Sequence, residues 1–181
     1  MPLFAPDTVT SLTSLVNLIN SGTSAIDGLL TPADLAEFLK REKFTGYVSG
    51  TQSELRDVRQ LRSRLTEIWH LKDDDAVPEI NAILRSARAL PQLVKHDEWD
   101  YHIHATTPDA SLSDRLGTEA AMALVDVVRS DEWDRLKSCA ATDCHDVLLD
   151  LSRNRSKKFC DSGNCGNREN VRAYRARQAI S

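Results

Sequence analysis

The chain has 181 residues, of which 41% are hydrophobic and 28% are charged, and its net charge is −4. No run of about 18 apolar residues occurs, which excludes a membrane-spanning helix. Residues 1–20 contain no Lys or Arg, so they lack the charged region of a secretory signal. We therefore expect a cytoplasmic protein whose cysteines stay reduced.

Apolar residues at helical spacing dominate residues 1–130, beginning with two helices. The apolar face of the first helix is formed by Leu12, Leu15, Val16 and Ile19. The second helix is predicted over residues 29–43, where Thr31 suits the N-cap and Pro32 suits the first helical position. Asp34 in its first turn favours the positive end of the helix dipole.

Two more helices are predicted between residues 51 and 90. Thr51 and Glu54 resemble a capping box at the start of the third helix. The apolar positions behind this box are Leu55, Val58, Leu61, Leu65 and Ile68. The fourth helix is predicted over residues 77–90, and its apolar face is formed by Ile80, Ile83, Leu84 and Ala87.

The pattern then becomes strand-like. Trp99, Tyr101 and Ile103 alternate with Asp100, His102 and His104. With a turn expected at residues 96–98, this alternation predicts a small β-hairpin. His96, His102 and His104 are candidates for a second metal site, and an ordinary hairpin surface is the alternative. After Pro108 a long helix is predicted, with apolar positions at Leu116, Ala120, Ala123, Leu124, Val127 and Val128.

Charge divides the chain near residue 130. Residues 135–181 hold ten basic and five acidic side chains, a net of +5, so the preceding residues hold 13 basic and 22 acidic ones, a net of −9. We therefore expect two domains, residues 1–130 and 131–181, joined closely because no Pro- or Gly-rich linker separates them. The alternative is one domain with a dipolar surface.

All four cysteines lie in the basic part. They form two pairs, each with four intervening residues, and fifteen residues separate the pairs: Cys139, Cys144, Cys160 and Cys165. This arrangement suits one structural zinc ion, which takes four thiolates tetrahedrally and leaves no open position for catalysis. Disulfides, scattered buried thiols, and His145 in place of Cys144 are the alternatives.

The segment between the cysteine pairs predicts a hairpin. Val147, Leu149 and Leu151 alternate as in a strand, and a polar turn follows at residues 152–155. Cys165 is expected at the start of the last helix. Asp150 precedes the polar turn, and we expect it to anchor Arg153 or Arg168 and so to fix the shape of this module.

The zinc module is also strongly basic. Its basic residues in the polar turn and the last helix are Arg153, Arg155, Lys157, Lys158, Arg168, Arg172, Arg175 and Arg177. Such a cluster is the electrostatic footprint of a protein that binds the phosphate backbone of nucleic acid. A solvated cationic face, or one that docks on the acidic first half of the chain, is the alternative.

Two families are similar to this chain. The two cysteine pairs, the DLSRN stretch at residues 150–154 and the run Cys165-Gly166-Asn167-Arg168 resemble the CGNR zinc finger. The segments LVNLIN (15–20), LLTPADLAEFL (29–39), LRDVRQL (55–61) and INAIL (80–84) resemble the ABATE domain that precedes this finger. The family pattern places an aromatic residue, often Trp, before the third cysteine, where this chain has Phe159.

The resemblance implies a bacterial, stress-linked transcription regulator with zinc on the four cysteines and with double-stranded DNA bound by the basic finger. We expect a mainly α fold with a small β-hairpin, followed by a treble-clef-like finger made of a β-hairpin and a helix. The helical domain would sense a small-molecule effector or form a homodimer. A protein-interaction module whose basic helix docks on an acidic partner is the second hypothesis. An enzyme is the third and is not expected, because no catalytic motif is present.

Overall fold

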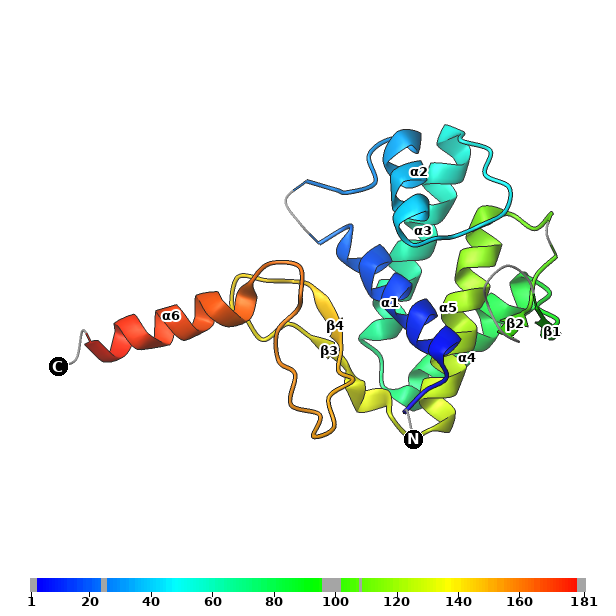
Figure 1. Cartoon of the computed structure of the whole chain (residues 1–181). Helices are drawn as coiled ribbons and strands as arrows, with labels where there is room; N and C mark the ends of the chain where they lie inside the picture. The colour runs from blue at the N-terminus through cyan, green and yellow to red at the C-terminus, as the bar shows by residue number, and fades with distance from the viewer. Residues whose placement is uncertain (1–2, 24–25, 96–101, 108, 179–181) are drawn as a thin grey trace. The chain divides into compact units, whose positions relative to one another are not determined.

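The computed structural model describes residues 3–23, 26–95, 102–107 and 109–178. The chain divides into two compact units, Met1–Trp133 and Asp134–Ser181, and the elements of each are labelled in Figure 1. Helices dominate the first unit, and each unit contains one two-stranded antiparallel sheet. This agrees with the predicted fold class. Within the described ranges, no helix combines the length and apolar character needed to cross a bilayer.

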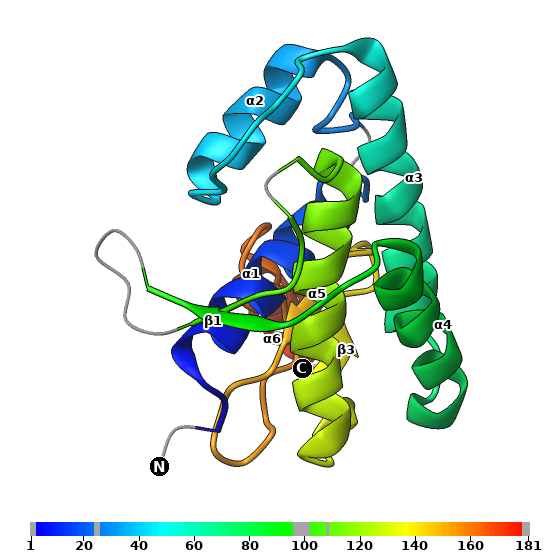
Figure 2. The same cartoon turned by 90° about the vertical axis from the view of Figure 1, so that its right-hand side faces the viewer.

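The helical unit is built around its last helix. Its helices are α1 (Pro6–Asn20), α2 (Pro32–Arg41), α3 (Gln52–Trp69), α4 (Asp73–Ser86) and α5 (Leu112–Arg129). Helix α5 packs against α1, α3 and α4 (Figure 2). Many of the best-buried side chains fall at predicted apolar positions: Leu12, Ile19, Leu55, Val58, Leu65, Ile68, Ile80, Leu124 and Val127. Leu29 and Leu35 are buried as well but were not among the predicted positions. Periodicity therefore identified much of the core of this unit.

Two helix starts show how local hydrogen bonds set the boundaries. At α2 the predicted capping is confirmed, because the Asp34 amide donates to Thr31 Oγ1 at 3.2 Å and the Thr31 amide donates to Asp34 Oδ2 at 2.8 Å. At α3 only half of the expected box forms. Thr51 accepts from the Glu54 amide, but the Glu54 carboxylate accepts from the amides of Ser49 and Gly50. The chain turns at Gly50, where φ is +67°, and this brings those amides to the carboxylate.

Helix α4 begins four residues earlier than predicted. It starts at Asp73 and includes Pro78, which has no amide hydrogen to donate within the helix. Three consecutive aspartates, Asp73 to Asp75, occupy its first turn, where their charge interacts favourably with the helix dipole. The apolar face used for the prediction begins at Ile80, so it did not reveal this acidic first turn.

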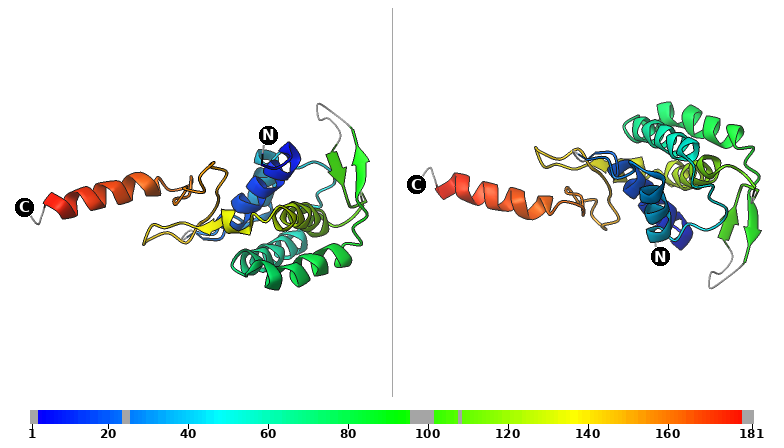
Figure 3. Two further views of the ribbon diagram at one scale, coloured as in Figure 1. Left: turned by 90° about the horizontal axis from the view of Figure 1, so that it is seen from below. Right: turned by 90° about the horizontal axis from the view of Figure 1, so that it is seen from above.

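The small sheet of the helical unit pairs β1 (Gln92–Val94) with β2 (His102–His104), and the two strands lie side by side in both views of Figure 3. Gln92 pairs with His104 and Val94 with His102. The predicted turn at residues 96–98, together with Trp99, Asp100 and Tyr101, lies outside the described residues. So do His96 and the side chain of His102, and the second metal site stays a prediction.

Two buried arginines tie loops to the helices of this unit. Arg62 donates to both oxygens of Asp27, at 2.8 and 2.7 Å. These bonds outweigh the opposing effect of burial and lower the pKa of Asp27 to about 2. Arg115 donates to the carbonyls of Thr45 and Tyr47 and so holds the loop between α2 and α3.

The second unit contains a turn η1 (Trp133–Arg135, shared with the end of the first), strands β3 (Leu136–Ser138) and β4 (Val147–Leu149), and helix α6 (Cys165–Gln178). The strands are antiparallel, with Leu136 opposite Leu149 and Ser138 opposite Val147. The segment between these strands therefore forms the turn of the hairpin. The chain also turns at residues 152–155, as predicted, where the Arg155 amide donates to the Ser152 carbonyl at 3.2 Å, but this turn does not join two paired strands. That polar segment is instead a loop leading back toward Cys160.

The predicted alternation along β4 is also wrong. All three residues of the strand are buried, whereas Leu151 is 45% exposed. Leu148 packs with the cysteines, so both faces of this short strand are covered. The strand ends before Asp150, whose side chain organises the following loop.

Candidate metal centre

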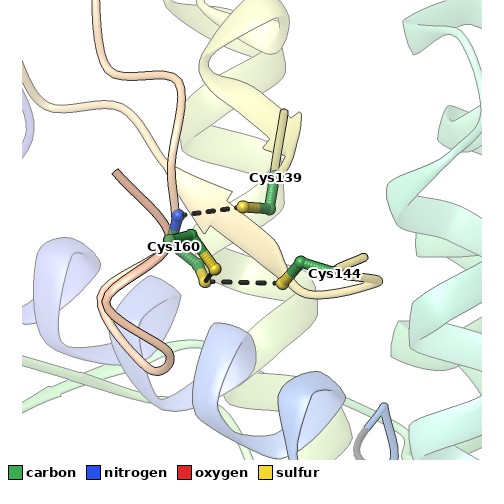
Figure 4. Close-up of side chains that lie close together, drawn as sticks. Cys139, Cys144 and Cys160 are labelled. Carbon is green, nitrogen blue, oxygen red and sulfur yellow. Dashed lines mark hydrogen bonds between the residues drawn. The ribbon is translucent and has the colours of Figure 1, made fainter. Parts of the chain in front are cut away.

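The four cysteines come from two turns that face each other. Cys139 and Cys144 lie in the connection between β3 and β4, Cys160 ends the following loop, and Cys165 begins α6, as predicted. One sulfur from each residue lies within 4.8 Å of all the others. Figure 4 shows the side chains of Cys139, Cys144 and Cys160 directed toward one another. Four soft ligands thus converge on one point.

The spacing of the sulfurs fits zinc. A tetrahedral ion with Zn–S bonds of about 2.3 Å separates its sulfurs by about 3.8 Å. The Sγ atoms of Cys144 and Cys160 are 3.7 Å apart, and those of Cys160 and Cys165 are 3.6 Å apart. All four cysteines are free thiols, so the disulfide alternative is wrong. His145 is exposed and does not belong to this cluster.

The thiols of this centre would exchange protons for a cation. Burial raises the pKa of Cys144 and of Cys165 above the ordinary value. A metal ion must therefore displace protons as it collects these sulfurs, which makes its binding dependent on pH. A closed set of four thiolates leaves no position for water, so the centre suits a structural ion.

Backbone hydrogen bonds hold the two cysteine turns together. The Cys139 amide donates to the Asp146 carbonyl at 2.8 Å and closes the first turn. The Ala140 amide donates to the Lys158 carbonyl at 2.8 Å, and the Cys160 amide donates to Cys139 Sγ at 3.4 Å. The second pair of cysteines is thereby fixed to the first by main-chain bonds as well as by the ligand cluster.

The glycine after Cys165 is explained by its neighbour. A Cβ atom on Gly166 would lie 3.3 Å from Cδ2 of Phe159, which is tighter than an ordinary contact. Phe159 is half-buried and packs against the cysteine cluster. An aromatic ring before the third cysteine and a small residue after the fourth therefore belong to one packing arrangement, and Phe159 fills the place of the usual aromatic residue.

Asp150 is the centre of the loop between the cysteine pairs, but its predicted partners are wrong. Its side chain is fully buried and accepts from Lys137 Nζ at 2.6 Å rather than from Arg153 or Arg168. It also accepts from the amides of Ser152 and Lys157, both at 2.9 Å. Burial alone would raise the pKa of Asp150, but these hydrogen bonds outweigh it and hold the pKa well below its usual range.

Two residues of this network were not predicted from the sequence. Lys137 also donates to the carbonyl of Arg155 at 2.6 Å, and buried Arg135 donates to the carbonyls of Asp150 and Ser152, both at 2.9 Å. Arg135 and Lys137 flank Leu136 and precede the first cysteine by four and two residues, with the two-residue period of a strand. This spacing could have predicted that the two basic side chains point to the same side, toward the loop.

The eight basic residues predicted to bind DNA fall into different settings. Four of them form ion pairs inside the finger: Arg155, Lys157, Arg168 and Arg172. By contrast, Arg153, Lys158 and Arg175 are exposed and make no side-chain ion pair or hydrogen bond with the residues that the structure describes. Arg177 is exposed near the end of α6.

Most of the first unit matches a known protein family. Residues 13–131 match the ABATE family, described as "Putative stress-induced transcription regulator". The chain belongs to the ABATE family. Residues 135–178 of this ABATE protein match the CGNR zinc finger, so the two follow each other in the expected order. None of the curated proteins matches the chain.

Proposed function

We propose that this ABATE protein is a zinc-dependent, DNA-binding transcription regulator whose finger, residues 131–181, binds double-stranded DNA. The observation that supports this most directly is that the finger has two groups of basic side chains. One group forms ion pairs within the finger, and the other is exposed and unpaired among the described residues. The basic side chains with acidic partners within the finger are Arg155, Lys157, Arg168 and Arg172. Arg153, Lys158 and Arg175 are exposed and have no such partner among the described residues, so they are available to phosphates. Phosphate contacts from such side chains position a protein on the duplex.

A surface cavity supports the same proposal. It has a volume of about 570 Å³ and is lined by residues 156–161 and 164–167. Its lining includes Lys157, Lys158 and Asp161, and the first turn of α6 contributes residues 165–167. Because Lys157 is paired with Asp161 in this lining, Lys158 is the lining cation that has no acidic partner among the described residues, and it favours an anionic ligand.

The remaining assignments follow from this role. Zinc serves as a structural ion and not as a catalyst, because four thiolates complete its coordination. The eight basic residues, including the four that have partners, are proposed to contribute to the positive surface. Residues 1–130 would form the sensing or homodimerising domain, with a small molecule as the effector. We keep the cytoplasm as the expected location.

The salt dependence of DNA binding tests the proposal. Fluorescence anisotropy would follow the zinc-loaded full chain on a 20-base-pair duplex, a length chosen to be about two helical turns, over a range of salt concentrations. Each phosphate contact contributes about 0.9 to the slope of log K against log salt. The double variant Arg153→Gln/Lys158→Gln should reduce that slope by about 2.

A charge-matched variant is the control. Lys40→Gln/Arg85→Gln removes two exposed positive charges from the helical unit and should leave the slope unchanged. The proposal is wrong if the zinc-loaded protein binds no duplex at low salt, or if its binding does not depend on salt. The protein-interaction hypothesis would then be favoured, in which the arginines of α6 dock on an acidic protein partner.

A further inference from the structure

Helix α6 has one side that is fixed to the finger. Arg168 contacts Asp143 at 3.1 Å and donates to Cys165 Sγ at 3.2 Å. One turn later, Arg172 contacts the same carboxylate at 3.6 Å and donates to Thr142 Oγ1 at 2.5 Å. Both arginines therefore attach α6 to the turn between the first two cysteines. This attachment sets the rotation of the helix about its own axis.

A neighbouring stripe of α6 is left exposed by this attachment. Its members follow one another at spacings of four, three and four residues, which places them on one face of the helix: Asn167, Val171, Tyr174 and Gln178. Val171 is 40% exposed and Tyr174 is 58% exposed. Gln178 Nε2 lies 3.5 Å from the Tyr174 hydroxyl, which confirms that the two share a face. We call these four residues the α6 stripe.

The α6 stripe has no role in holding the described part of the finger together. Apart from the contact between Gln178 and Tyr174, no hydrogen bond or ion pair joins its side chains to another described residue. From residue 170 to residue 178, every residue of α6 is exposed. The stripe thus exposes two amide side chains, a valine and a tyrosine. Its helix is held in a fixed orientation by the contacts of Arg168 and Arg172.

We propose that the α6 stripe reads base edges in the major groove of double-stranded DNA, an inference that rests on the proposed function. Asn and Gln side chains can form paired hydrogen bonds with adenine, and aliphatic groups contact the methyl group of thymine. The stripe offers both kinds of group in succession. Tyr174 lies between Val171 and Gln178 and adds a hydroxyl that can donate or accept.

Charge and dimensions favour duplex DNA as the occupant. Helix α6 carries four arginines and one glutamate, a net charge of +3. Its 14 residues make it about 21 Å long, and the major groove, about 12 Å wide, admits an α-helix. A protein groove that binds a helix requires a continuous apolar face, whereas the α6 stripe has an amide side chain at each end and only Val171 and Tyr174 between them. Arg175, beside the stripe, is placed to contact the phosphate backbone.

Comparison of two duplexes tests this inference. The zinc-loaded full chain would first enrich a preferred sequence from a random duplex pool. Anisotropy would then give the affinity for that duplex and for a shuffled duplex of equal composition. Gln178→Ala should weaken binding to the enriched duplex about 5- to 150-fold, corresponding to one lost base contact. The affinity for the shuffled duplex should change by less than about twofold. The slope of log K against log salt should stay the same, because no charge is removed.

Further variants separate base reading from charge. Val171→Ala and Tyr174→Ala should also act mainly on the enriched duplex, and alanine preserves an exposed helix. Arg175→Gln is the matched control, since it should weaken both duplexes equally and lower the salt slope by about 1. Circular dichroism and a zinc content of one ion per chain would verify that each variant is folded.

The outcomes distinguish this inference from the proposed function. If stripe variants weaken both duplexes equally, or leave the enriched duplex unaffected, base reading by α6 is wrong while DNA binding stands. The same holds if the wild type binds duplexes but enriches no sequence. If the wild type binds no duplex at low salt, the proposed function itself is wrong, and the α6 stripe belongs to another kind of interface.

Discussion

The two units of this chain use different means to hold a shape. The helical unit buries a continuous set of leucine, isoleucine and valine side chains, such as Leu12, Val58 and Ile68, each no more than 1% exposed. Among the described residues, the cluster at the centre of the finger buries three cysteines, Ala141 and Leu148, and Cys144 and Phe159 are partly buried against it. Its loop is organised by Asp150 and Lys137. Apolar burial therefore stabilises the first unit, and ligands and polar bonds stabilise the second.

Removal of zinc should have the largest effect on the difference between the two units, because it should unfold one unit and leave the other folded. We expect chelation, or Cys160→Ser, to unfold the finger, because metal binding in comparable modules contributes about 10 kcal/mol. Hydrogen exchange should show loss of amide protection at residues 136–149. Protection in α5 should persist, since its core contains no metal ligand.

Tryptophan fluorescence provides an internal control for that experiment. The three tryptophans, Trp69, Trp99 and Trp133, all fall in the first compact unit, Met1–Trp133, and the indole of Trp133, its last residue, donates to the Leu71 carbonyl at 3.0 Å. Their emission should change little when zinc is removed. Retained protection of the finger without metal, or a simultaneous loss of both units, would contradict the separation described above.

A smaller effect is expected from the ion pair between fully buried Asp150 and Lys137, whose side chain is 27% exposed. Asp150→Asn leaves Lys137 beside an uncharged group, and breaking a buried pair destabilises by about 3 kcal/mol. Because zinc binding and folding are linked, this should weaken the apparent zinc affinity by about 100-fold. Competition with a chromophoric chelator would measure it.

The control for this variant is an exposed ion pair of the same unit. Asp134→Asn removes the partner of Arg155, and both side chains of that pair are more than 40% exposed. Exposed pairs contribute about 0–1 kcal/mol, so zinc affinity should change only a few-fold. Equal effects of the two variants would show that burial does not distinguish the pairs.

The third prediction concerns acid and the helical unit. The pKa of Asp27 is lowered to about 2 by Arg62, so the unfolded chain binds a proton that the folded chain does not. The pair should stabilise the folded state by about 2 kcal/mol above pH 4, and this contribution should disappear as the pH falls to about 2.

Urea unfolding, followed by tryptophan fluorescence, would measure this in the wild type and in Asp27→Asn. The difference in unfolding free energy should be largest at neutral pH and should shrink between pH 4 and pH 2. A difference that is constant over this range would argue against a charged Asp27 in the ion pair.

The helical unit was largely predictable from sequence because its stabilising pattern is local. Residues three and four positions apart report directly on a helix face, so positions such as Leu55, Ile80 and Leu124 identified the core. The N-cap of α3 was predicted correctly at Thr51, but the hydrogen-bond partners of a side chain that can reach several amides were not. Glu54, which binds Ser49 and Gly50 instead of its expected partner, is an example.

The finger was predictable in composition but not in connectivity. Four clustered cysteines indicated the metal centre, yet the hairpin was placed one segment too late, because a cysteine-bearing turn lacks the usual glycine or asparagine signal. The pairing of Lys137 with Asp150 depends on the register of β3 and β4. A sequence pattern that ignores register cannot assign such a partner.

The position of the cysteines in two short turns also has a kinetic consequence. Cys139 and Cys144 approach each other through a turn of four residues, as do Cys160 and Cys165, and only fifteen residues separate the two turns. Loops of this size close on the order of 100 ns, so a metal ion held by one pair meets the other pair almost at once. We expect the speed at which this finger assembles to be limited by delivery of the ion, which makes its folding a direct readout of available zinc.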